Sequence, residues 1–281
     1  MSEKIGNQII RLKEIDSTNS YLKARKNLLR RHGLVVIAEM QNSGRGRAGR
    51  KFTSVIGSNL TFSVVLHPNL PVQEIQIFTL LAGVAVARVL ENYVNNIRLK
   101  WPNDVLVNEK KICGILLETI TIPDKNFPVL IMGIGLNTKG HVNDYPGELQ
   151  NIVTTIEYEL SSISNKTFKT QMAPVLKNEI IFQQLLLELD SCVEEFNPVS
   201  INSKINEKYY SGRTSLLQEW LLRANALGRK VCSFYNEEER SKDSGIIGKI
   251  VGLTREGYLQ IRTDSGQIET HVSGDIIDMK G

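Results

Sequence analysis

Apolar residues recur at two spacings along the chain, and the two spacings predict strands and helices respectively. Short apolar runs bounded by polar residues predict strands, at residues 9–12, 33–40, 60–66, 97–101, 105–107, 113–122 and 129–134. Apolar residues at helical spacing predict a buried helix from Ile75 to Val94. Two further helical patterns cover residues 168–196 and 201–222. The expected fold is therefore a mixed sheet packed with helices, of the α+β class.

After Gly228 the pattern changes to short strands that are separated by turns. Strands are expected at residues 230–234, 246–253, 258–262 and 268–272. Four or five strands within about fifty residues predict a small barrel or half-barrel. We expect a boundary near Ala226, with one domain over residues 1–226 and a second over residues 227–281.

Composition and charge narrow the class of protein. The formal net charge of the 281 residues is only +4, which does not indicate a general nucleic-acid coat. Three widely spaced cysteines, Cys113, Cys192 and Cys232, suggest reduced thiols and neither a disulfide framework nor a zinc site. We see no secretory pattern at the N-terminus and no apolar run of membrane-spanning length. The expected location is the cytoplasm.

Three glycines and three arginines alternate between Gly44 and Arg50, just after the predicted strand 33–40. Glycine lets the backbone approach a ligand closely, and arginine donates to phosphate or carboxylate oxygens. The pattern G-x-G-x-x-G also occurs in dinucleotide-binding turns, but those lead directly into a helix, whereas residues 51–59 form a polar loop before another strand. A solvated surface loop is the other alternative. The residue types favour an anion site.

Four other segments are candidates for chemistry, and each has an ordinary structural alternative. Residues 16–19 offer several helix N-caps, and residues 100–104, taken alone, favour an ordinary Pro-Asn-Asp hairpin turn. A lysine pair precedes a strand that is interrupted by Gly114, which can mark close backbone approach, although a lysine in such a place usually extends into solvent. Gly133 and Gly135 leave space at a strand end, or simply end the strand.

Taken together and in this order, the motifs resemble those of the biotin protein ligases. They are Asp16-Ser17-Thr18-Asn19, Gln41 with Gly44-Arg45-Gly46-Arg47-x-Gly49-Arg50, Lys100-Trp101-Pro102-Asn103-Asp104, Lys111-x-x-Gly114-Ile115-Leu116 and Gly133-x-Gly135-x-Asn137. The resemblance runs from about residue 9 to the C-terminus. It implies a catalytic domain similar to class II aminoacyl-tRNA synthetases and a small SH3-like β-barrel.

The resemblance implies an activity and its partners. Members of that family join biotin to ATP, with Mg²⁺, to form biotinyl-5′-adenylate, and then transfer biotin to a lysine of the biotin carboxyl carrier domain of a carboxylase. Members that repress transcription have an additional helix-turn-helix domain, which the residues before Ile9 are too few to form. We therefore expect a ligase that binds neither DNA nor a membrane, as a monomer or a homodimer.

The resemblance also assigns roles to individual residues. Lys111, Arg45 and Arg47 are the expected catalytic residues, and Asp104 is the candidate base for the acceptor lysine. The expected biotin-binding residues are Ser17, Thr18, Asn19, Gln41, Gly44, Arg45, Gly46, Arg47, Lys111, Gly114, Gly133 and Gly135. The expected ATP-binding residues are Arg47, Arg50, Phe52, Asn103 and Asn137. No protein metal site is expected.

Two departures and two alternatives accompany these assignments. This chain has Phe52 where the family often has tryptophan, and Ala48 where some members have arginine. Lipoate attachment uses a related fold and the same adenylate chemistry, but lipoate lacks the ureido ring that Ser17, Thr18 and Gln41 would recognise. A binding module without catalytic activity is the second alternative, and the presence of Lys111 with two loop arginines argues against it.

Overall fold

The elements of the chain group into a large N-terminal set and a smaller C-terminal set. The first set of strands is β1 (Ile9–Ile15), β2 (Val35–Gln41), β3 (Asn59–Leu66), β4 (Ile97–Lys100), β5 (Asp104–Val107), β6 (Lys110–Ile120) and β7 (Val129–Asn137). The helices are α1 (Thr18–Lys23), α2 (Ile77–Leu90), α3 (Ile156–Ser164), α4 (Asn178–Phe196) and α5 (Ile205–Ala224). The last strands are β8 (Lys230–Phe234), β9 (Ile246–Leu253), β10 (Leu259–Thr263), β11 (Ile268–His271) and β12 (Asp275–Asp278).

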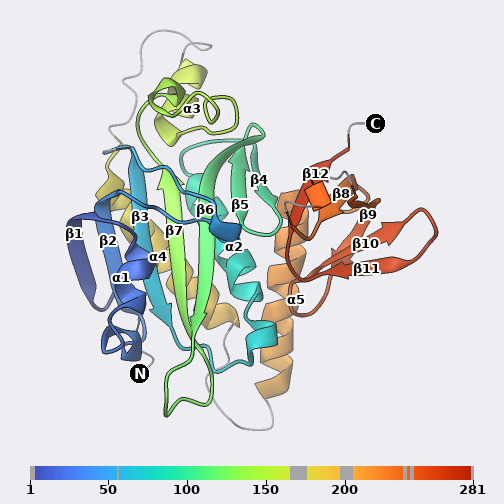
Figure 1. Cartoon of the computed structure of the whole chain (residues 1–281), viewed down its shortest axis with the longest axis horizontal. Coiled ribbons are helices and arrows are strands. Elements are labelled where there is room, and N and C mark those ends of the chain that lie inside the picture. Colours follow the sequence, from blue (N-terminus) through green and yellow to red (C-terminus); the bar gives the residue numbers. More distant parts are fainter. Residues whose placement is uncertain are drawn as a thin grey trace.

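The strands form two sheets (Figure 1). This computed structural model describes residues 4–55, 57–164, 176–196, 205–236, 239–240 and 244–279. The large sheet has the order β1-β2-β3-β7-β6-β5-β4, in which β1 and β2 run parallel and the other neighbours run antiparallel. The small sheet has the order β11-β10-β9-β8-β12, with antiparallel pairs throughout. The predicted α+β class is confirmed.

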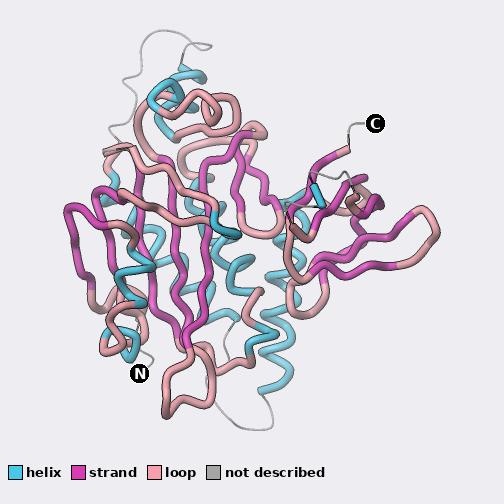
Figure 2. The backbone as a smooth tube through the Cα atoms, viewed as in Figure 1, coloured by secondary structure: helices cyan, strands magenta, loops and turns pink. Residues whose placement is uncertain are grey.

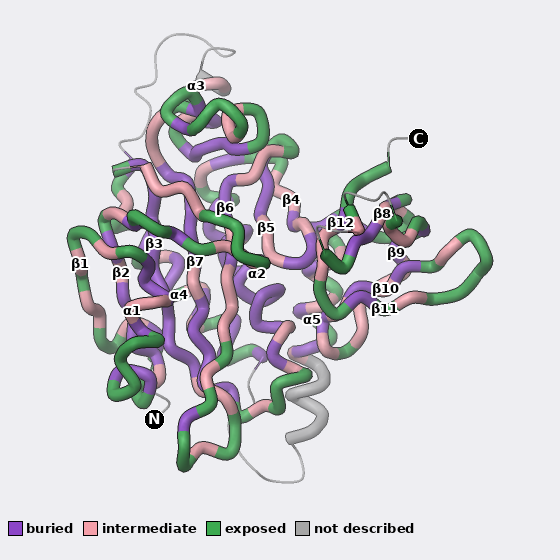
Figure 3. The backbone as a smooth tube through the Cα atoms, in the orientation of Figure 1, coloured by how far each residue is buried: buried purple, intermediate pink, exposed green. Residues whose placement is uncertain are grey.

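The central strands of the large sheet are buried on both faces, and their two faces serve different purposes. Every residue of β3 is buried (Figure 3). Because side chains alternate between faces of a strand, Val64 packs with the cluster under α2 and α4, while Val65 packs with the cluster under α1. Further along the α1 face, the side chains of β3 and β7 become small, with Ser63 and Gly133 paired across the two strands. The small side chains leave room on that face.

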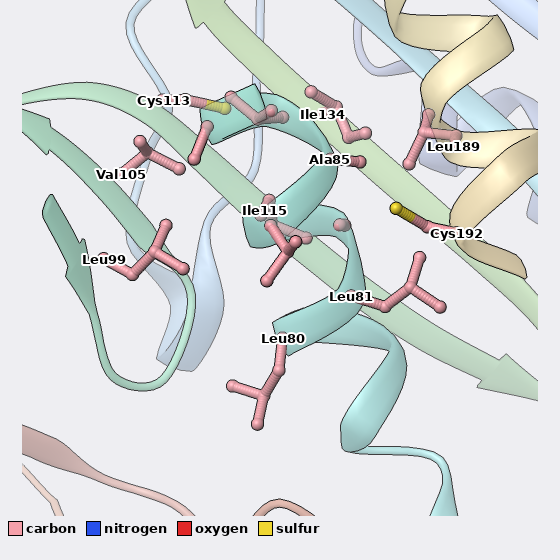
Figure 4. Packing of buried hydrophobic residues seen from close by; sticks show 14 of the residues in the cluster. Leu80, Leu81, Ala85, Leu99, Val105, Cys113, Ile115, Ile134, Leu189 and Cys192 are labelled. Atoms are coloured by element: carbon pink, nitrogen blue, oxygen red, sulfur yellow. The ribbon is translucent and has the colours of Figure 1, made fainter. Parts of the chain in front are cut away.

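Helix α2 is the centre of the core on the opposite face. Every residue of α2 except Arg88 is buried, and Figure 4 shows Ala85 beside Ile134 of the sheet, Leu81 pointing toward α4, and Leu80 pointing away from the sheet. Burying a leucine side chain in this way stabilises the fold by roughly 1.5–3 kcal/mol. A helix that is apolar on all sides is buried on all sides. Helix α2 therefore packs against one face of the large sheet, and α1 packs against the other.

The expectation that no apolar run reaches membrane-spanning length is wrong by length and composition. The helical segment Val72–Leu90 has a mean hydropathy of 1.4 and is long enough to cross a bilayer. However, 72% of the residues in that window are buried inside the structure. The segment therefore has the burial expected of a core helix.

The small sheet packs beside β4 and the N-terminal end of α2. The indole nitrogen of Trp101 donates to the carbonyl oxygen of Gly257 at 3.3 Å, and the Tyr258 hydroxyl donates to the carbonyl oxygen of Gln73 at 2.6 Å. Trp101 is buried, as aromatic side chains with one polar handle often are at such contacts. These bonds hold the small sheet so that the Gly274 carbonyl oxygen, just before β12, accepts a hydrogen bond from Arg47 in the loop between β2 and β3.

Two predicted helices extend into segments outside the described residues. The predicted stretch 168–196 corresponds to α4 from Asn178 onward, and residues 168–175 are not described. The predicted stretch 201–222 corresponds to α5 from Ile205 onward, and residues 201–204 are not described. Helix α3 was not predicted. The division at residues 226 and 227 stays a prediction, and the chain passes there from α5 to β8.

A buried histidine makes the stability of the small sheet depend on pH. The His271 ring is fully buried, lies 2.9 Å from the Ser233 hydroxyl and stacks on Tyr235. Burial lowers the pKa of His271, and the nearby Glu269 and Glu239 carboxylates only partly oppose this. The unfolded chain therefore takes up a proton on acidification before the folded sheet does, so stability is full above the ordinary histidine pKa and declines as the pH falls below it.

We expect the free energy of unfolding to decrease between neutral pH and pH about 5.5, and His271→Asn to reduce this decrease, because the asparagine amide can still bond to Ser233 without titrating. Urea unfolding at several pH values measures both quantities. Equal pH slopes in the two proteins would assign the decrease to other groups.

Candidate functional site

The predicted motifs meet in a single pocket on the α1 face of the large sheet. Its cavity has a volume of about 120 Å³. Its lining contains Ser17, Thr18, Asn19, Gln41, Arg45, Gly46, Arg47, Arg50, Lys51, Phe52, Phe62, Asn103, Asp104, Lys111, Gly114, Ile115, Leu116, Gly133, Ile134, Gly135 and Asp275. A concave site with convergent polar groups is the usual form of a small-molecule site.

The inner end of the pocket is lined by buried hydrogen-bonding groups at the start of α1. Ser17 is the N-cap of that helix, and its hydroxyl accepts from the backbone nitrogen of Ser20 at 3.4 Å. The Gln41 side-chain oxygen accepts from the Thr18 backbone nitrogen at 2.8 Å and from its hydroxyl at 3.1 Å. Because these groups hold one another in place, the pocket presents a fixed set of donors and acceptors.

The loop between β2 and β3 crosses in front of the large sheet (Figure 2). Several of its residues, among them Arg45, Arg47 and Phe52, line the pocket. The Phe52 backbone nitrogen donates to the Gly44 carbonyl oxygen at 2.9 Å, and the Gly46 nitrogen donates to the Arg50 carbonyl oxygen at 2.7 Å. A Cβ atom on Gly44 would lie 2.4 Å from the Phe52 carbonyl oxygen, so this close approach requires glycine. In the described residues of this loop, the one helical element before β3 is the short 3₁₀ turn Arg47–Gly49, so no α-helix follows the glycines there in the dinucleotide-binding manner.

The three loop arginines differ in their partners. Arg45 lies 3.3 Å from a Glu118 carboxylate oxygen, and Arg50 pairs with the Asp275 carboxylate. Arg47 donates to the Gly274 carbonyl oxygen at 3.3 Å but forms no ion pair with any residue that the structure describes. Burial lowers the pKa of the Arg47 guanidinium, although Asp275 opposes the shift. Arg47 therefore places a partly desolvated positive charge at the pocket, which an anionic ligand would compensate.

A lysine and a carboxylate stand opposite this loop. The Lys111 ammonium nitrogen lies 2.6 Å from an Asp104 carboxylate oxygen. A Cβ atom on Gly114 would come within 3.1 Å of the Lys111 ammonium, so glycine at this position lets the lysine lie across β6. The Asn103 amide donates to the Ile115 carbonyl oxygen at 2.7 Å, which ties the turn before β5 to β6. The arrangement brings Lys111 and Asp104 into the lining together.

The two glycines of β7 face side chains rather than open space. A Cβ atom on Gly133 would lie 2.5 Å from the Asn19 amide oxygen, and one on Gly135 would lie 2.5 Å from the Phe52 ring. Gly133 therefore makes room for Asn19, and Gly135 makes room for the aromatic ring. Both glycines still line the pocket, at its floor.

Two predicted site residues do not line the pocket. Gly44 lies at the base of the loop, and Asn137 lies behind the floor. The Asn137 amide donates to the Thr154 carbonyl oxygen at 3.1 Å and accepts from Asn59 at 2.8 Å. Its side chain is buried, and its predicted contact with the adenine edge stays a prediction. Its role in this structure is to hold the end of β7 against the segment after it.

Comparison with known proteins identifies the family and supports the fold. Residues 12–137 match the biotin/lipoate A/B protein ligase family, and residues 240–277 match the biotin protein ligase C-terminal domain. The bifunctional ligase/repressor BirA of Bacillus spizizenii is 32% identical over 276 residues, which cover 98% of this chain and 75% of that protein. The chain belongs to the biotin protein ligase family.

Other members of the biotin protein ligase family agree in fold and in extent. The biotin protein ligase of Aquifex aeolicus, solved in complex with biotin and ATP, superposes with a TM-score of 0.69 at 28% identity and covers 98% of this chain and 100% of that one. The human biotin–protein ligase is 31% identical over 88% of this chain, which spans 31% of that protein. The predicted resemblance, catalytic fold and C-terminal strand domain are confirmed.

Several residues of this ligase site were not predicted. Asp275 enters the lining from the small sheet, and Phe62 from β3. Ser63 and Glu118 lie behind the lining and bond to its members. A sequence signal existed for Glu118, which continues the alternation of Gly114 and Leu116 along one face of β6. The described part of the chain contains no group of three or more His, Cys, Asp or Glu side chains that could hold a metal ion.

Proposed function

We propose that this chain is an ATP-dependent biotin protein ligase that forms biotinyl-5′-AMP and then transfers biotin to a lysine of a biotin carboxyl carrier domain. The observation that carries the proposal is the pairing of a hydrogen-bonding inner end with a cationic mouth in one pocket. A ureido ring at Thr18 and Gln41 places a carboxylate arm toward Arg47 and Lys111. The same pocket thus fits a ligand that is polar at both ends and apolar between them.

The first half-reaction joins two anions. A biotin carboxylate oxygen attacks the α-phosphorus of ATP, a new oxygen–phosphorus bond forms, and the bond to the β-phosphate oxygen breaks so that pyrophosphate leaves. Arg47 and Lys111 neutralise the carboxylate and α-phosphate oxygens, whose charges would otherwise repel. Arg45 supports the same loop. These roles are supported by the positions of Arg45, Arg47 and Lys111, which all line the same pocket.

The nucleotide occupies the outer part of the pocket. Arg50 is placed to contact phosphate oxygens in exchange for its Asp275 partner, and the Phe52 ring offers a face for adenine. Asn103 lies at the same rim. Mg²⁺ would be held mainly through the phosphates, since it favours oxygen ligands and keeps several waters.

The second half-reaction moves the biotinyl group to an amine. The acceptor lysine nitrogen attacks the acyl carbon of the adenylate, a carbon–nitrogen bond forms, and AMP leaves with the electron pair of the broken acyl–oxygen bond. The amine must lose a proton, and we assign its removal to the Asp104 carboxylate, which lines the pocket 2.6 Å from the Lys111 ammonium. Residues 1–226 form the catalytic domain in this proposal, and residues 227–281 contribute Asp275 to its rim.

Pyrophosphate exchange tests the first half-reaction and separates biotin from lipoate. The protein is incubated with ATP, Mg²⁺, labelled pyrophosphate and either acid, and label entering ATP is measured. Exchange that requires biotin, and that lipoate does not support, is the expected result. Exchange with lipoate alone would move the chain to lipoate attachment, and no exchange with either acid would favour a silent binding module.

Substitution of Gly135 tests the placement of adenine. The added methyl group of Gly135→Ala must displace the Phe52 ring, so we expect the KM for ATP to rise about tenfold, in keeping with the cost of overpacking a contact. Gly147→Ala is the matched control, because nothing lies within 4 Å of its added Cβ atom. Exchange kinetics measure both variants. An unchanged KM for ATP in the Gly135 variant would remove Phe52 from the nucleotide site.

A further inference from the structure

A chain of hydrogen bonds links the inner end of the pocket to the side of β6. The Ser63 hydroxyl lies 2.6 Å from the Thr18 hydroxyl and 2.6 Å from the Asn19 amide oxygen. The Asn19 amide nitrogen in turn donates to a Glu118 carboxylate oxygen at 3.0 Å. Thr18, Ser63 and Asn19 are all buried, so the chain of hydrogen bonds links two lining residues, Thr18 and Asn19, through groups that are shielded from bulk water.

The Glu118 carboxylate uses its two oxygens for two different parts of the site. One oxygen accepts from Asn19, and the other lies 3.3 Å from Arg45 and 3.0 Å from Lys23. Glu118 is only 15% exposed, whereas Arg45 is 45% exposed. One side chain therefore contacts the helix that carries the inner polar groups and the loop that covers the pocket.

The surroundings keep this carboxylate ionised. Burial opposes the charge of Glu118, but hydrogen bonds from Asn19 and Lys23 and the charge of Arg45 outweigh it, so its pKa is lowered from the ordinary value. An ionised carboxylate accepts hydrogen bonds only, which fixes the Asn19 amide with its nitrogen toward Glu118 and its oxygen toward Ser63. The orientation of the inner polar groups thus depends on the charge of Glu118.

We propose that Glu118 is a positioning residue that couples the biotin-ring end of the pocket to the seating of the arginine loop through Asn19 on one oxygen and Arg45 on the other. The proposal rests on the ligase function proposed above for its substrate, but the contacts exist in the chain without ligand. The proposal also assigns different roles to the two loop arginines. Arg45 is matched by Glu118 and anchors the loop, while Arg47 keeps its charge for the ligand.

Glu118→Gln tests the Arg45 side of this link. The introduced amide can still accept from Asn19, but it loses the charge that holds Arg45 and Lys23. We expect the KM for biotin in pyrophosphate exchange to rise about tenfold while kcat stays within about twofold, as for the loss of one charged hydrogen bond that positions a ligand. Lys23→Gln is the matched control, because Lys23 shares the carboxylate but does not line the pocket, and its KM stays within about twofold.

A polarity swap tests the Asn19 side. Asn19→Asp places a second carboxylate against Glu118, and we expect it to raise the KM for biotin more than Glu118→Gln does, by about thirtyfold. Adding Glu118→Gln to it gives the introduced carboxylate a donor again. We therefore expect the double variant to have a lower KM for biotin than Asn19→Asp alone. A double variant whose rise in KM equals the product of the two single rises would overturn the proposal.

Trypsin cleavage within the loop tests the same link without any substrate. In the ligand-free protein, Glu118→Gln will be cut after the loop arginines several-fold faster than the wild type and Lys23→Gln, because the loop has lost its anchor. Circular dichroism checks that each variant is folded. Equal cleavage rates in folded proteins would overturn the proposal even if biotin supports exchange. If Glu118→Gln is cleaved faster but the wild-type protein shows no pyrophosphate exchange, the link is supported and the ligase function is rejected.

Discussion

Replacing Lys111 with alanine is expected to slow biotinyl-adenylate formation by about a thousandfold, the usual cost of removing a group that neutralises developing charge. Lys111 lines the pocket beside Asp104, and its ammonium lies across Gly114 toward the space where carboxylate and α-phosphate meet. The second half-reaction expels a nucleotide phosphate from the same place. Transfer from preformed adenylate will therefore slow as well. Single-turnover assays measure the two steps separately.

Lys110→Ala is the control for the Lys111 variant. Lys110 precedes Lys111 on β6, but its ammonium lies over the Tyr158 ring, outside the pocket lining. Its activity is expected to stay within about twofold of wild type, as for a surface substitution. Adenylate formation by Lys111→Ala within about tenfold of wild type would show that the lysine binds without stabilising the transition state.

Replacing Arg47 with methionine is expected to separate activity from stability. Methionine keeps most of the side-chain volume but removes a desolvated charge that no described carboxylate pairs with. Adenylate formation will fall by about a hundredfold to a thousandfold, because the two reacting anions lose a cation. The unfolding midpoint of the ligand-free protein will stay equal or rise, since an uncompensated partly buried charge costs free energy. Pyrophosphate exchange and thermal unfolding measure the two effects.

Arg11→Met is the matched control for the Arg47 variant. Arg11 lies on β1 and forms an exposed ion pair with Glu179, so both activity and midpoint should change little. A lower unfolding midpoint together with lost activity of the Arg47 variant would contradict this prediction. In that case Arg47 would hold the loop to Gly274 as a structural support, and its charge would not be kept for the ligand.

The sequence predicts the large sheet and the pocket floor well because both depend on short-range patterns. Alternation along β3 and β7 places Ser63 and Gly133 on one face and the large apolar residues on the other, and this alternation is visible in the residues themselves. Helix α3 was missed although Thr155, just before it, caps the helix by accepting from the Tyr158 backbone nitrogen at 3.0 Å. A Thr-Thr pair before an apolar position was the available signal.

The remaining parts of the site depend on contacts between distant segments. Asp275 reaches the pocket because contacts such as the Trp101–Gly257 hydrogen bond hold the small sheet beside the large one, and no local pattern encodes such contacts. Asn137 was expected in the nucleotide site, but its strand register places it beside Asn59, where the two amides bond to each other. The same limit applies to Arg45 and Arg47. Their residue types are identical, and only their neighbours in space give them different partners.

Intact mass of a carrier domain tests the proposed function most directly. The wild-type protein is incubated with ATP, Mg²⁺, biotin and the biotin carboxyl carrier domain of a carboxylase, with a lysine-to-arginine carrier as the control. We predict that the carrier gains the mass of one biotinyl group, that the gain requires ATP, and that the control carrier gains nothing. A carrier whose mass is unchanged, or a lysine-to-arginine carrier that gains the same mass, would contradict the account.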